Sequence, residues 1–315
     1  MIPICRPLLP TSDKLMPYIH RIDESRHYTN FSPLCREYEE RLSNHFGAYV
    51  VSTSSGTQAL VATLIALDFL PGQLVTCPAF TFAATPGAIV SAGYTPFFVD
   101  VNEDTWGADK SNLPSVGVMP FGLPIDGDFD VIDAAAGFDT VTASNIPQII
   151  STHATKSFST GEGGVVVCKN KHLIDRIRII INHGISPDRS ISVRGINAKM
   201  SGYHAAVGLA SLDEWPERRE RWKCVGNWYG AGEYAISTHI IKLKSSAATM
   251  ATHLKKHGID TRLSWYDCAT QPAYLRFPRR NLPITEDLIE KTIALPFYSD
   301  MKKKDVDYIL EKLNA

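Results

Sequence analysis

The chain has 315 residues, of which 44% are hydrophobic, so it is long enough for two domains built around a large buried core. Its 32 Lys and Arg nearly balance its 33 Asp and Glu, which leaves a formal net charge of −1 at pH 7. This balance excludes the overall basic footprint typical of proteins that bind nucleic acid or anionic membranes.

Nothing in the sequence predicts export, membrane insertion or a metal site. The N-terminus is too polar and Pro-rich for a signal peptide, and no uncharged apolar run approaches the roughly 20 residues that span a bilayer. His253 and His257 stand four apart, but no carboxylate is close in sequence and a solvated helix face is the better interpretation. The cysteines form no CxxC pair, which favours reduced thiols in a cytoplasmic protein. They are Cys5, Cys35, Cys77, Cys168, Cys224 and Cys268.

The N-terminal part of the chain alternates helical and strand-like patterns. Residues 38–46 have helical spacing, and Gly47 provides a C-terminal stop. A short strand at 49–51 leads through a polar turn at 52–57 into a mostly apolar helix. The pattern continues with a strand at 74–77, a helix at 85–92 and a strand at 96–101.

The remaining apolar runs predict four more strands, at 118–121, 130–134, 148–151 and 165–168, and helices at 173–181 and 201–212. Alternating strands and helices indicate an α/β fold with a largely parallel sheet. A charged run at 215–222 leads towards a second region, which ends in helical patterns at 285–293 and 304–313. We therefore expect two domains, residues 1–220 and 221–315.

The connection between two of the predicted strands is unusually short. Only residues 122–130 separate the strand at 118–121 from the one ending at Asp133, and a parallel crossover normally needs a dozen residues or more. Either the two strands are not adjacent parallel neighbours, or one face of the sheet is left uncovered there. A partner subunit would be one source of the missing cover.

Three segments carry residues suited to chemistry, each with a simpler alternative. The turn SSGTQAL, residues 54–60, places small residues before a helix N-terminus, which suits either a phosphate site or an ordinary turn. Asp133 ends an apolar strand, where a carboxylate either holds a pyridinium nitrogen protonated or caps a helix. Lys156 lies among small and hydroxylated residues before a Gly-rich turn; it is either a desolvated, Schiff-base-forming lysine or a surface lysine.

The order of these motifs resembles the DegT/DnrJ/StrS family of sugar aminotransferases. The similar segments are RPLLP, SRHYTNFSP, SSGTQAL, CPAFTFAATPGAIVSAGYTPFFVDV, VIDAAAG, SxxxxKSFSTGEGG, GINAKMSGYHAAVGLASLD, HGIDTRL and ALPFYSDM. The resemblance covers most of the chain. It implies the type I fold of pyridoxal phosphate (PLP) enzymes, the fold of aspartate aminotransferase. That fold has a large domain with a mostly parallel sheet and a small C-terminal α+β domain.

The resemblance also implies roles for individual residues. Lys156 matches the lysine that binds PLP as a Schiff base and moves protons, and Asp133 matches the partner of the pyridine nitrogen. Phe82 matches the aromatic residue that stacks on the cofactor ring. The phosphate ligands of the family match Gly56, Thr57, Ser151 and, from a neighbouring subunit, Asn197. The active site would then be shared across a homodimer.

Candidate substrate contacts are fewer and have alternatives. His183 follows a helix in an NHG motif and either faces the active site or interacts with the helix dipole. Trp265 and Tyr266 lie where the small domain of the family approaches the substrate, although they could equally belong to its core. Ala136 departs from the glutamine common in the family, and the chain is shortened between residues 105 and 133 and around 224–243.

The implied activity is PLP-dependent transfer of an amino group from glutamate to a nucleotide-linked keto sugar, for polysaccharide or secondary-metabolite sugar biosynthesis. A dehydratase branch of the family replaces the lysine with histidine, so Lys156 favours transamination. Other PLP chemistry on the same fold, either a dehydratase or an amino-acid-level transaminase, is one alternative. A non-catalytic relative is the other, motivated by Ala136 and the shortened segments.

Overall fold

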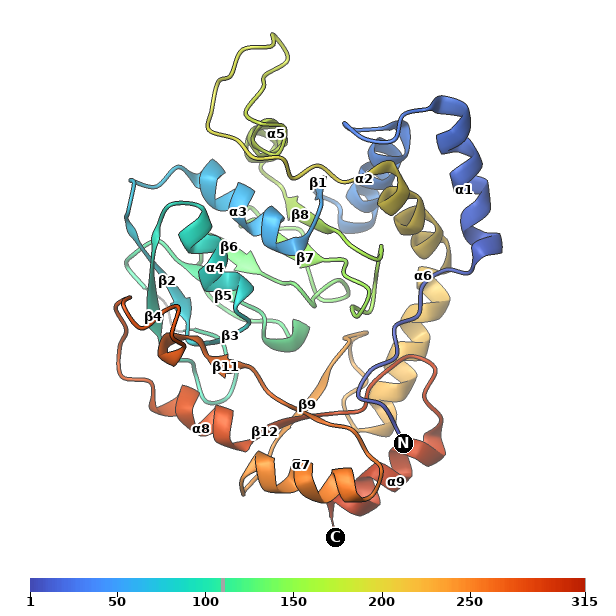
Figure 1. Ribbon diagram of the computed structural model, residues 1–315, viewed down its shortest axis with the longest axis vertical. Helices are drawn as coiled ribbons and strands as arrows, with labels where there is room; N and C mark the ends of the chain where they lie inside the picture. The colour runs from blue at the N-terminus through green and yellow to red at the C-terminus, as the bar shows by residue number, and fades with distance from the viewer. Residues whose placement is uncertain (109–110, 315) are drawn as a thin grey trace.

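The computed structural model describes residues 1–108 and 111–314. A mostly parallel sheet occupies the centre of the larger part of the molecule (Figure 1). Its strands are β1 (Tyr49–Thr53), β2 (Leu74–Pro78), β4 (Thr95–Val99), β5 (Val116–Val118), β6 (Val131–Asp133), β7 (Gln148–Ser151) and β8 (Gly164–Cys168). They follow the order β1-β8-β7-β6-β5, and a bridge between Thr76 and Ser115 attaches the β2–β4 pair to β5. Strand β8 runs antiparallel to both its neighbours, whereas β2–β4, β5–β6 and β6–β7 pair in parallel.

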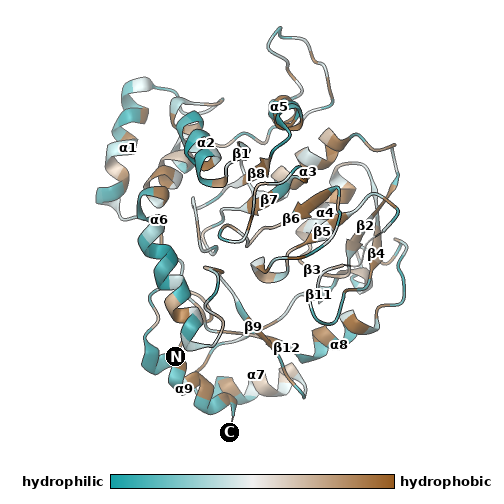
Figure 2. Cartoon of the chain, turned by 180° about the vertical axis from the view of Figure 1, so that it is seen from behind, coloured by the Kyte–Doolittle hydropathy of each residue, from teal (hydrophilic) through white to brown (hydrophobic). Residues whose placement is uncertain are grey.

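The sheet is buried on both faces, because successive apolar residues of a strand point to opposite sides. Val51 and Val166 face a core shared with α3 (Gly56–Leu67), α4 (Ala84–Ser91) and α5 (Lys171–Ile180). Val50, Val165 and Val167 face a second core, which α2 (Pro33–Phe46) and α6 (Gly202–Trp228) complete. Figure 2 shows the apolar colour of the strands and the polar colour of much of α1 (Ser12–Ser25) and α6.

Strands β5 and β6 are adjacent parallel neighbours, with Val116 opposite Val131 and Val118 opposite Asp133. The first alternative from the sequence, that they are not neighbours, is wrong. Strand β5 ends at Val118 rather than at residue 121, so the connection spans residues 119–130 and contains a short helical turn, η1 (Pro120–Gly122). No α-helix lies in this connection. Instead, Phe129 packs so closely on Gly117 that a Cβ there would lie 2.6 Å from the ring, and the connection itself thus covers this part of the sheet.

A smaller antiparallel sheet lies at the other end of the molecule, in the order β10-β12-β9. Its elements are β9 (His239–Lys242), α7 (Ala247–Lys256), β10 (Arg262–Leu263), α8 (Pro283–Lys291), β12 (Thr292–Leu295) and α9 (Lys303–Leu313). The predicted helix at 285–293 is therefore wrong at its end, where Thr292 begins a strand. The N-terminus joins this unit through pairing of Ile2 with Ile259, which places both termini at the same end (Figure 1).

Helix α6 links the two units as one continuous element. The sequence pattern predicts an end near residue 212, but the helix continues through Pro216 to Trp228 because Trp215 and Trp222 are buried on either side of the proline. Residue 220, the expected domain boundary, lies inside this helix. The division into residues 1–220 and 221–315 stays a prediction.

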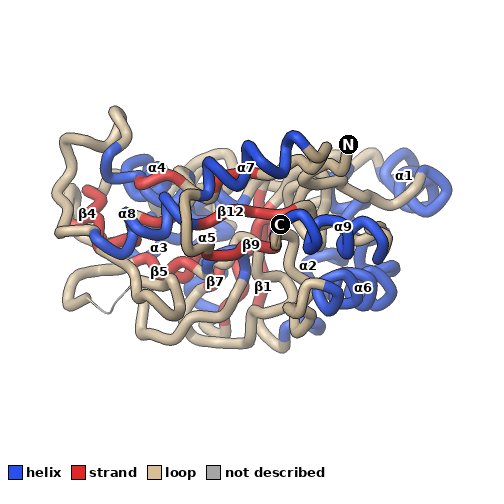
Figure 3. The backbone as a smooth tube through the Cα atoms, turned by 90° about the horizontal axis from the view of Figure 1, so that it is seen from below, coloured by secondary structure: helices blue, strands red, loops and turns tan. Residues whose placement is uncertain are grey.

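The chain crosses back to the large sheet between β10 and α8. Strand β11 (Tyr266–Asp267) pairs with β3 (Phe80–Thr81), and a short turn, η2 (Cys268–Thr270), follows it. The backbone N–H of Phe98 then donates to Pro278, and that of Arg280 donates to Phe98, which covers the edge of β4. Figure 3, seen from below, shows α7, α8 and α9 beside β9 and β12. None of the helices in the described part of the chain has the length and apolar character that a bilayer crossing requires.

Candidate active site

Asp133 lies at the carboxyl end of β6, in the centre of the large sheet. Its side chain is 8% exposed and is held by two hydrogen bonds, from the Thr85 hydroxyl at 2.8 Å and from the Ala135 backbone N–H at 3.1 Å. Thr81 donates in turn to Thr85, because the single hydroxyl proton of Thr85 is used for Asp133. The carboxylate therefore has a fixed orientation at the edge where α/β proteins bind ligands.

Lys156 lies in the loop that connects the antiparallel strands β7 and β8. Backbone hydrogen bonds close this loop, from Ala154 to Gly161, from Lys156 to His153 and from Thr160 to Thr152. Lys156 therefore lies in a hydrogen-bonded turn, and its side chain is half-buried. The sequence predicted a tight turn after this lysine, and the structure confirms it.

The structure brings Lys156 and Asp133 within electrostatic reach of each other. Burial lowers the pKa of Lys156, and the Asp133 carboxylate opposes that shift. Burial also raises the pKa of Asp133, while its hydrogen bonds from Thr85 and Ala135 and the charge of Lys156 oppose the rise. A lysine with a lowered pKa provides more neutral amine at physiological pH, which is the form that attacks a carbonyl carbon.

An anion site lies at the N-terminus of α3. Ser55 caps the helix by accepting from the Gln58 backbone N–H at 3.1 Å. Among the described residues, the amides of Gly56 and Thr57 have no hydrogen-bond partner, as expected for the first turn of a helix. Ser151, at the end of β7, approaches so closely that a Cβ on Gly56 would lie 2.9 Å from its Cβ. Free amides, a serine hydroxyl and the positive end of the helix dipole together suit a phosphate group.

Phe82 follows β3 and is 63% exposed, although its neighbour Phe80 is fully buried. A large exposed aromatic ring beside a buried strand has a free face that a planar ligand can cover. The position fits the expected stacking on a cofactor ring.

Asn197 and His183 lie on the two arms of an excursion that follows α5. The backbone N–H of His183 donates to Ile196, and Asn182 and Asn197 form a bridge. Both predicted ligands are exposed, and Asn197 accepts from Lys199 at 2.9 Å. Figure 1 shows the excursion extending away from the body of the molecule beyond α5.

Trp265 and Tyr266 differ in their surroundings, although they are adjacent in sequence. Trp265 stacks on Phe121 at 4.1 Å between ring centroids and also contacts Phe80, in a cluster that joins the small unit to the large sheet. Tyr266 pairs with Thr81 and is 70% exposed. The structure thus places Trp265 in an aromatic core and leaves the ring of Tyr266 free.

Thr85 is a site residue that the sequence analysis did not single out. It is the first residue of the predicted helix at 85–92, a position where threonine is common for reasons of local structure. Its contact with Asp133 depends on the packing of α4 against β6, which the sequence does not reveal. Over residues 1–108 and 111–314, no group of three or more His, Cys, Asp or Glu side chains is arranged to hold a metal ion.

The residues present fit PLP, on the geometry of this chain alone. The unpaired amides of Gly56 and Thr57 with Ser151 fit its phosphate, Asp133 its pyridine nitrogen, Lys156 its aldehyde carbon and Phe82 a ring face. Where a family glutamine would contact the ring hydroxyl, Ala136 offers no side-chain donor.

Comparison with known proteins places the chain in a family. The model of the DegT/DnrJ/EryC1/StrS aminotransferase family matches residues 11–116 and 140–314. A dTDP-4-amino-4,6-dideoxy-D-glucose transaminase of Escherichia coli is 27% identical, over 99% of this chain and 98% of the relative.

Solved structures agree with this match. DesI, crystallised in the presence of its TDP-sugar product, is 27% identical with a TM-score of 0.88, and the match covers 99% of this chain and 92% of DesI. A Bacillus cereus protein assigned as a PLP-dependent aminotransferase is 25% identical with a TM-score of 0.90 over the whole of both chains. The expected fold of PLP-dependent aminotransferases is confirmed. The chain therefore belongs to the DegT/DnrJ/EryC1/StrS aminotransferase family and is a PLP-dependent transaminase.

Proposed function

We propose that the protein transfers an amino group from glutamate to a nucleotide-linked keto sugar, in the biosynthesis of a polysaccharide or of a secondary-metabolite sugar. The observation that carries the proposal is the arrangement at the carboxyl edge of the sheet, where hydrogen bonds from Thr85 and Ala135 orient the Asp133 carboxylate, Lys156 lies in the loop after β7, and α3 begins with free amides. The names of the E. coli transaminase and of the DesI product, both TDP-type sugars, support a nucleotide sugar as the acceptor.

Each residue of the site has a distinct role in this proposal. Bound PLP supplies an electron sink for the carbon that loses its proton. The Lys156 amine would hold the cofactor at its aldehyde carbon; once free, it would take the proton from the α-carbon of the donor and deliver it to that former aldehyde carbon. Asp133 keeps the ring nitrogen protonated, and Phe82 covers one ring face. Gly56, Thr57 and Ser151 anchor the phosphate and thereby fix the ring relative to Lys156.

We also propose that the enzyme works as a homodimer in the cytoplasm. Asn197 is exposed and pairs with Asn182 where the excursion after α5 returns, and in this proposal it contacts the phosphate site of a second copy. His183 and Tyr266 are exposed and would contact the substrate, whereas Trp265 would position Tyr266 through its aromatic neighbours. All six cysteines are free, as expected for a reducing compartment.

The visible absorption spectrum of the protein with added PLP, before and after glutamate, tests the proposal. The wild type should show the band of a lysine-bound cofactor and lose it when glutamate is added. Lys156→Ala should lack the band, while Lys171→Ala, which removes an exposed lysine of α5, should retain it. A wild type without the band would overturn the role of Lys156 and favour a non-catalytic relative. If the band persists with glutamate but is lost with another amino acid, only the assignment of glutamate as the amino donor would be wrong.

A further inference from the structure

Lys156 and Asp133 lie on separate segments of the chain, and their relative position has to be maintained by other contacts. Their strands are neighbours in the large sheet, with Asp133 opposite Ile149. Asp133 is the last residue of β6, but Lys156 lies beyond the end of β7, in the loop that leads to β8. Pairing of the strands therefore does not by itself fix the lysine side chain relative to the carboxylate.

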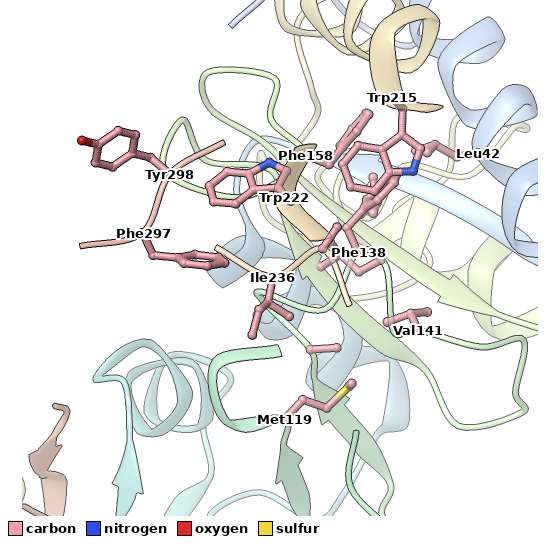
Figure 4. Close-up of a cluster of buried hydrophobic side chains, with 14 of the residues drawn as sticks. Leu42, Met119, Phe138, Val141, Phe158, Trp215, Trp222, Ile236, Phe297 and Tyr298 are labelled. Atoms are coloured by element: carbon pink, nitrogen blue, oxygen red, sulfur yellow. The ribbon is translucent and has the colours of Figure 1, made fainter. Parts of the chain in front are cut away.

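An aromatic stack joins the two segments. Phe138 lies five residues after Asp133, and Phe158 lies two residues after Lys156. Their rings are nearly parallel, with 3.9 Å between the ring centroids, and are only 2% and 1% exposed. The ring of Trp215 meets both rings edge-on, at 4.8 and 5.6 Å between centroids. Figure 4 shows these three rings in one cluster of buried side chains, so packing links the chain after the lysine to the chain after the aspartate.

Helix α6 also holds the backbone on both sides of Phe158. The Trp222 indole N–H donates to the Ser157 carbonyl at 3.2 Å. The Ser211 hydroxyl donates to the Ser159 carbonyl at 2.7 Å, and Ser211 is itself fully buried. The backbone directly after Lys156 is thus tied to the helix at two carbonyl groups, in addition to the contact of its aromatic ring.

All of these contacts come from one face of α6. Positions 211, 215 and 222 lie within about 40° of one another around an ideal α-helix of 3.6 residues per turn. The Trp215 indole N–H is buried without a hydrogen-bond partner in the described part of the chain, so the ring packing of Trp215, and not a polar contact, accounts for its place on this face. A single helix can therefore hold three consecutive residues, 157–159.

The same helix also holds the segment that contains Asp133. Arg219 of α6 forms a salt bridge with Asp139, whose side chain is 7% exposed. The other carboxylate oxygen of Asp139 accepts from the backbone N–H of Ala235, beyond the end of α6, at 2.9 Å. Helix α6 thus contacts the chain after the aspartate as well as the chain after the lysine.

We propose that these side chains form a positioning frame, which holds the Lys156 amine at a fixed distance from the Asp133 carboxylate. The frame acts on the reaction only through these two residues, so its members are positioning residues and not catalytic ones. They are Phe138, Phe158, Ser211, Trp215 and Trp222.

Loosening the frame has two expected consequences. Asp133 is the charged group that raises the pKa of Lys156 against the effect of burial, and this attraction weakens as the separation grows. A lysine that moves freely also has its amine in the correct place for proton transfer less often, and a misplacement of about 1 Å can slow a reaction by roughly 100-fold.

The coupling between the two residues tests the frame without cofactor or substrate. Competitive labelling with acetic anhydride across a pH series, read by mass spectrometry, measures the pKa of Lys156 in the cofactor-free chain. Asp133→Asn should lower this pKa in the otherwise wild-type protein. In a Phe158→Leu background, the same substitution should lower it much less, because the two groups are no longer held close together. A loss of stability alone would not remove the coupling.

Phe98→Leu is the matched control, because Phe98 is fully buried in the core on the other face of the sheet. In this background Asp133→Asn should lower the pKa of Lys156 by the full amount. Ser211→Ala removes one hydrogen bond of the frame and keeps its rings, so it decides the question if Phe158→Leu does not fold. An unchanged lowering in every frame variant that folds would overturn the proposal, and so would an equal reduction in Phe98→Leu.

Turnover by the PLP-loaded enzyme provides a second readout. Because Lys156 moves the proton, Phe158→Leu should lower kcat by roughly 10- to 100-fold, whereas the KM for the amino donor should change little. Phe98→Leu should leave kcat close to the wild-type value. A variant with a raised KM and an unchanged kcat would assign the stack to substrate binding and contradict the positioning role.

Discussion

Burial shifts the pKa values of Lys156 and Asp133 in opposite directions: it lowers that of the lysine and raises that of the aspartate. Burial favours the neutral amine and the neutral carboxylic acid, whereas their mutual attraction favours both charged forms. The hydrogen bonds from Thr85 and Ala135 also stabilise the charged form of Asp133 and so lower its pKa. A buried carboxylate held in this way is ready to face a protonated ring nitrogen, at a cost to the stability of the empty protein.

The pH dependence of cofactor capture should report this pair. The rate at which Lys156 of the cofactor-free protein reacts with PLP follows its neutral amine, so it should rise with pH around a midpoint below the ordinary lysine pKa. Asp133 raises the pKa of Lys156, so Asp133→Asn should move the midpoint to still lower pH. Rapid-mixing absorbance across a pH series measures it. Asp188→Asn, on an exposed loop, should leave the midpoint unchanged. A midpoint that Asp133→Asn does not move would refute the coupling.

At the scale of elements, the connection between β5 and β6 shows how a parallel crossover can do without an α-helix. A parallel strand pair needs apolar cover on both faces. Here the cover over Gly117 is one aromatic ring, and glycine is required because any side chain there would overlap Phe129. One buried side chain thus takes over part of the role of a crossover helix, within a chain that is shortened at this point.

Phe129→Ala should destabilise the protein by about 3 to 5 kcal/mol, because it removes a buried ring and exposes the sheet at Gly117. Urea unfolding followed by circular dichroism measures the change in the free energy of unfolding. Leu123→Ala, in the same connection but 38% exposed, is the control and should cost far less. Similar values for the two variants would show that Phe129 is not the cover of this face.

At the scale of the whole molecule, Asp100 joins the large sheet to the small unit. It follows β4 and accepts hydrogen bonds from the backbone N–H groups of Ile284 and Thr285, at 2.9 and 2.8 Å, and from the Thr285 hydroxyl at 2.7 Å. These are the free N–H groups at the start of α8, so Asp100 caps a helix that is distant in sequence. The aromatic stack of Phe121 on Trp265 lies in the same region and adds apolar contact.

Asp100→Ala should therefore loosen the small unit at one point, with a cost of about 0.5 to 2 kcal/mol. Amide hydrogen exchange should become faster at Ile284 and Thr285, while the amides of β7 and β8 keep their protection. Asp188→Ala removes a local loop contact with Ser190 and serves as the control. If exchange at Ile284 and Thr285 stays slow, α8 does not depend on this cap.

The sequence alone determined the features that depend on local pattern and residue type. The alternation of apolar segments predicts the α/β sheet because burial on both faces demands near-continuous apolar strands, and the structure confirms it. The segments SFSTGEGG after Lys156 and CPAFTF before the helix at 85–92 indicated the family of PLP-dependent sugar aminotransferases, which the comparisons confirm. These signals survive in the sequence because each is carried by a few neighbouring residues.

Only the tertiary structure decided the features that depend on contacts between distant segments. The sequence analysis did not predict α1 or the short strands of the small sheet, whose pairing partners lie far apart in the chain. It ended α6 too early, because burial of Trp215 and Trp222 overrides the helix-breaking tendency of Pro216. It also could not show that Thr85 holds Asp133. Such contacts are fixed by packing, and packing has no periodic signature in a single sequence.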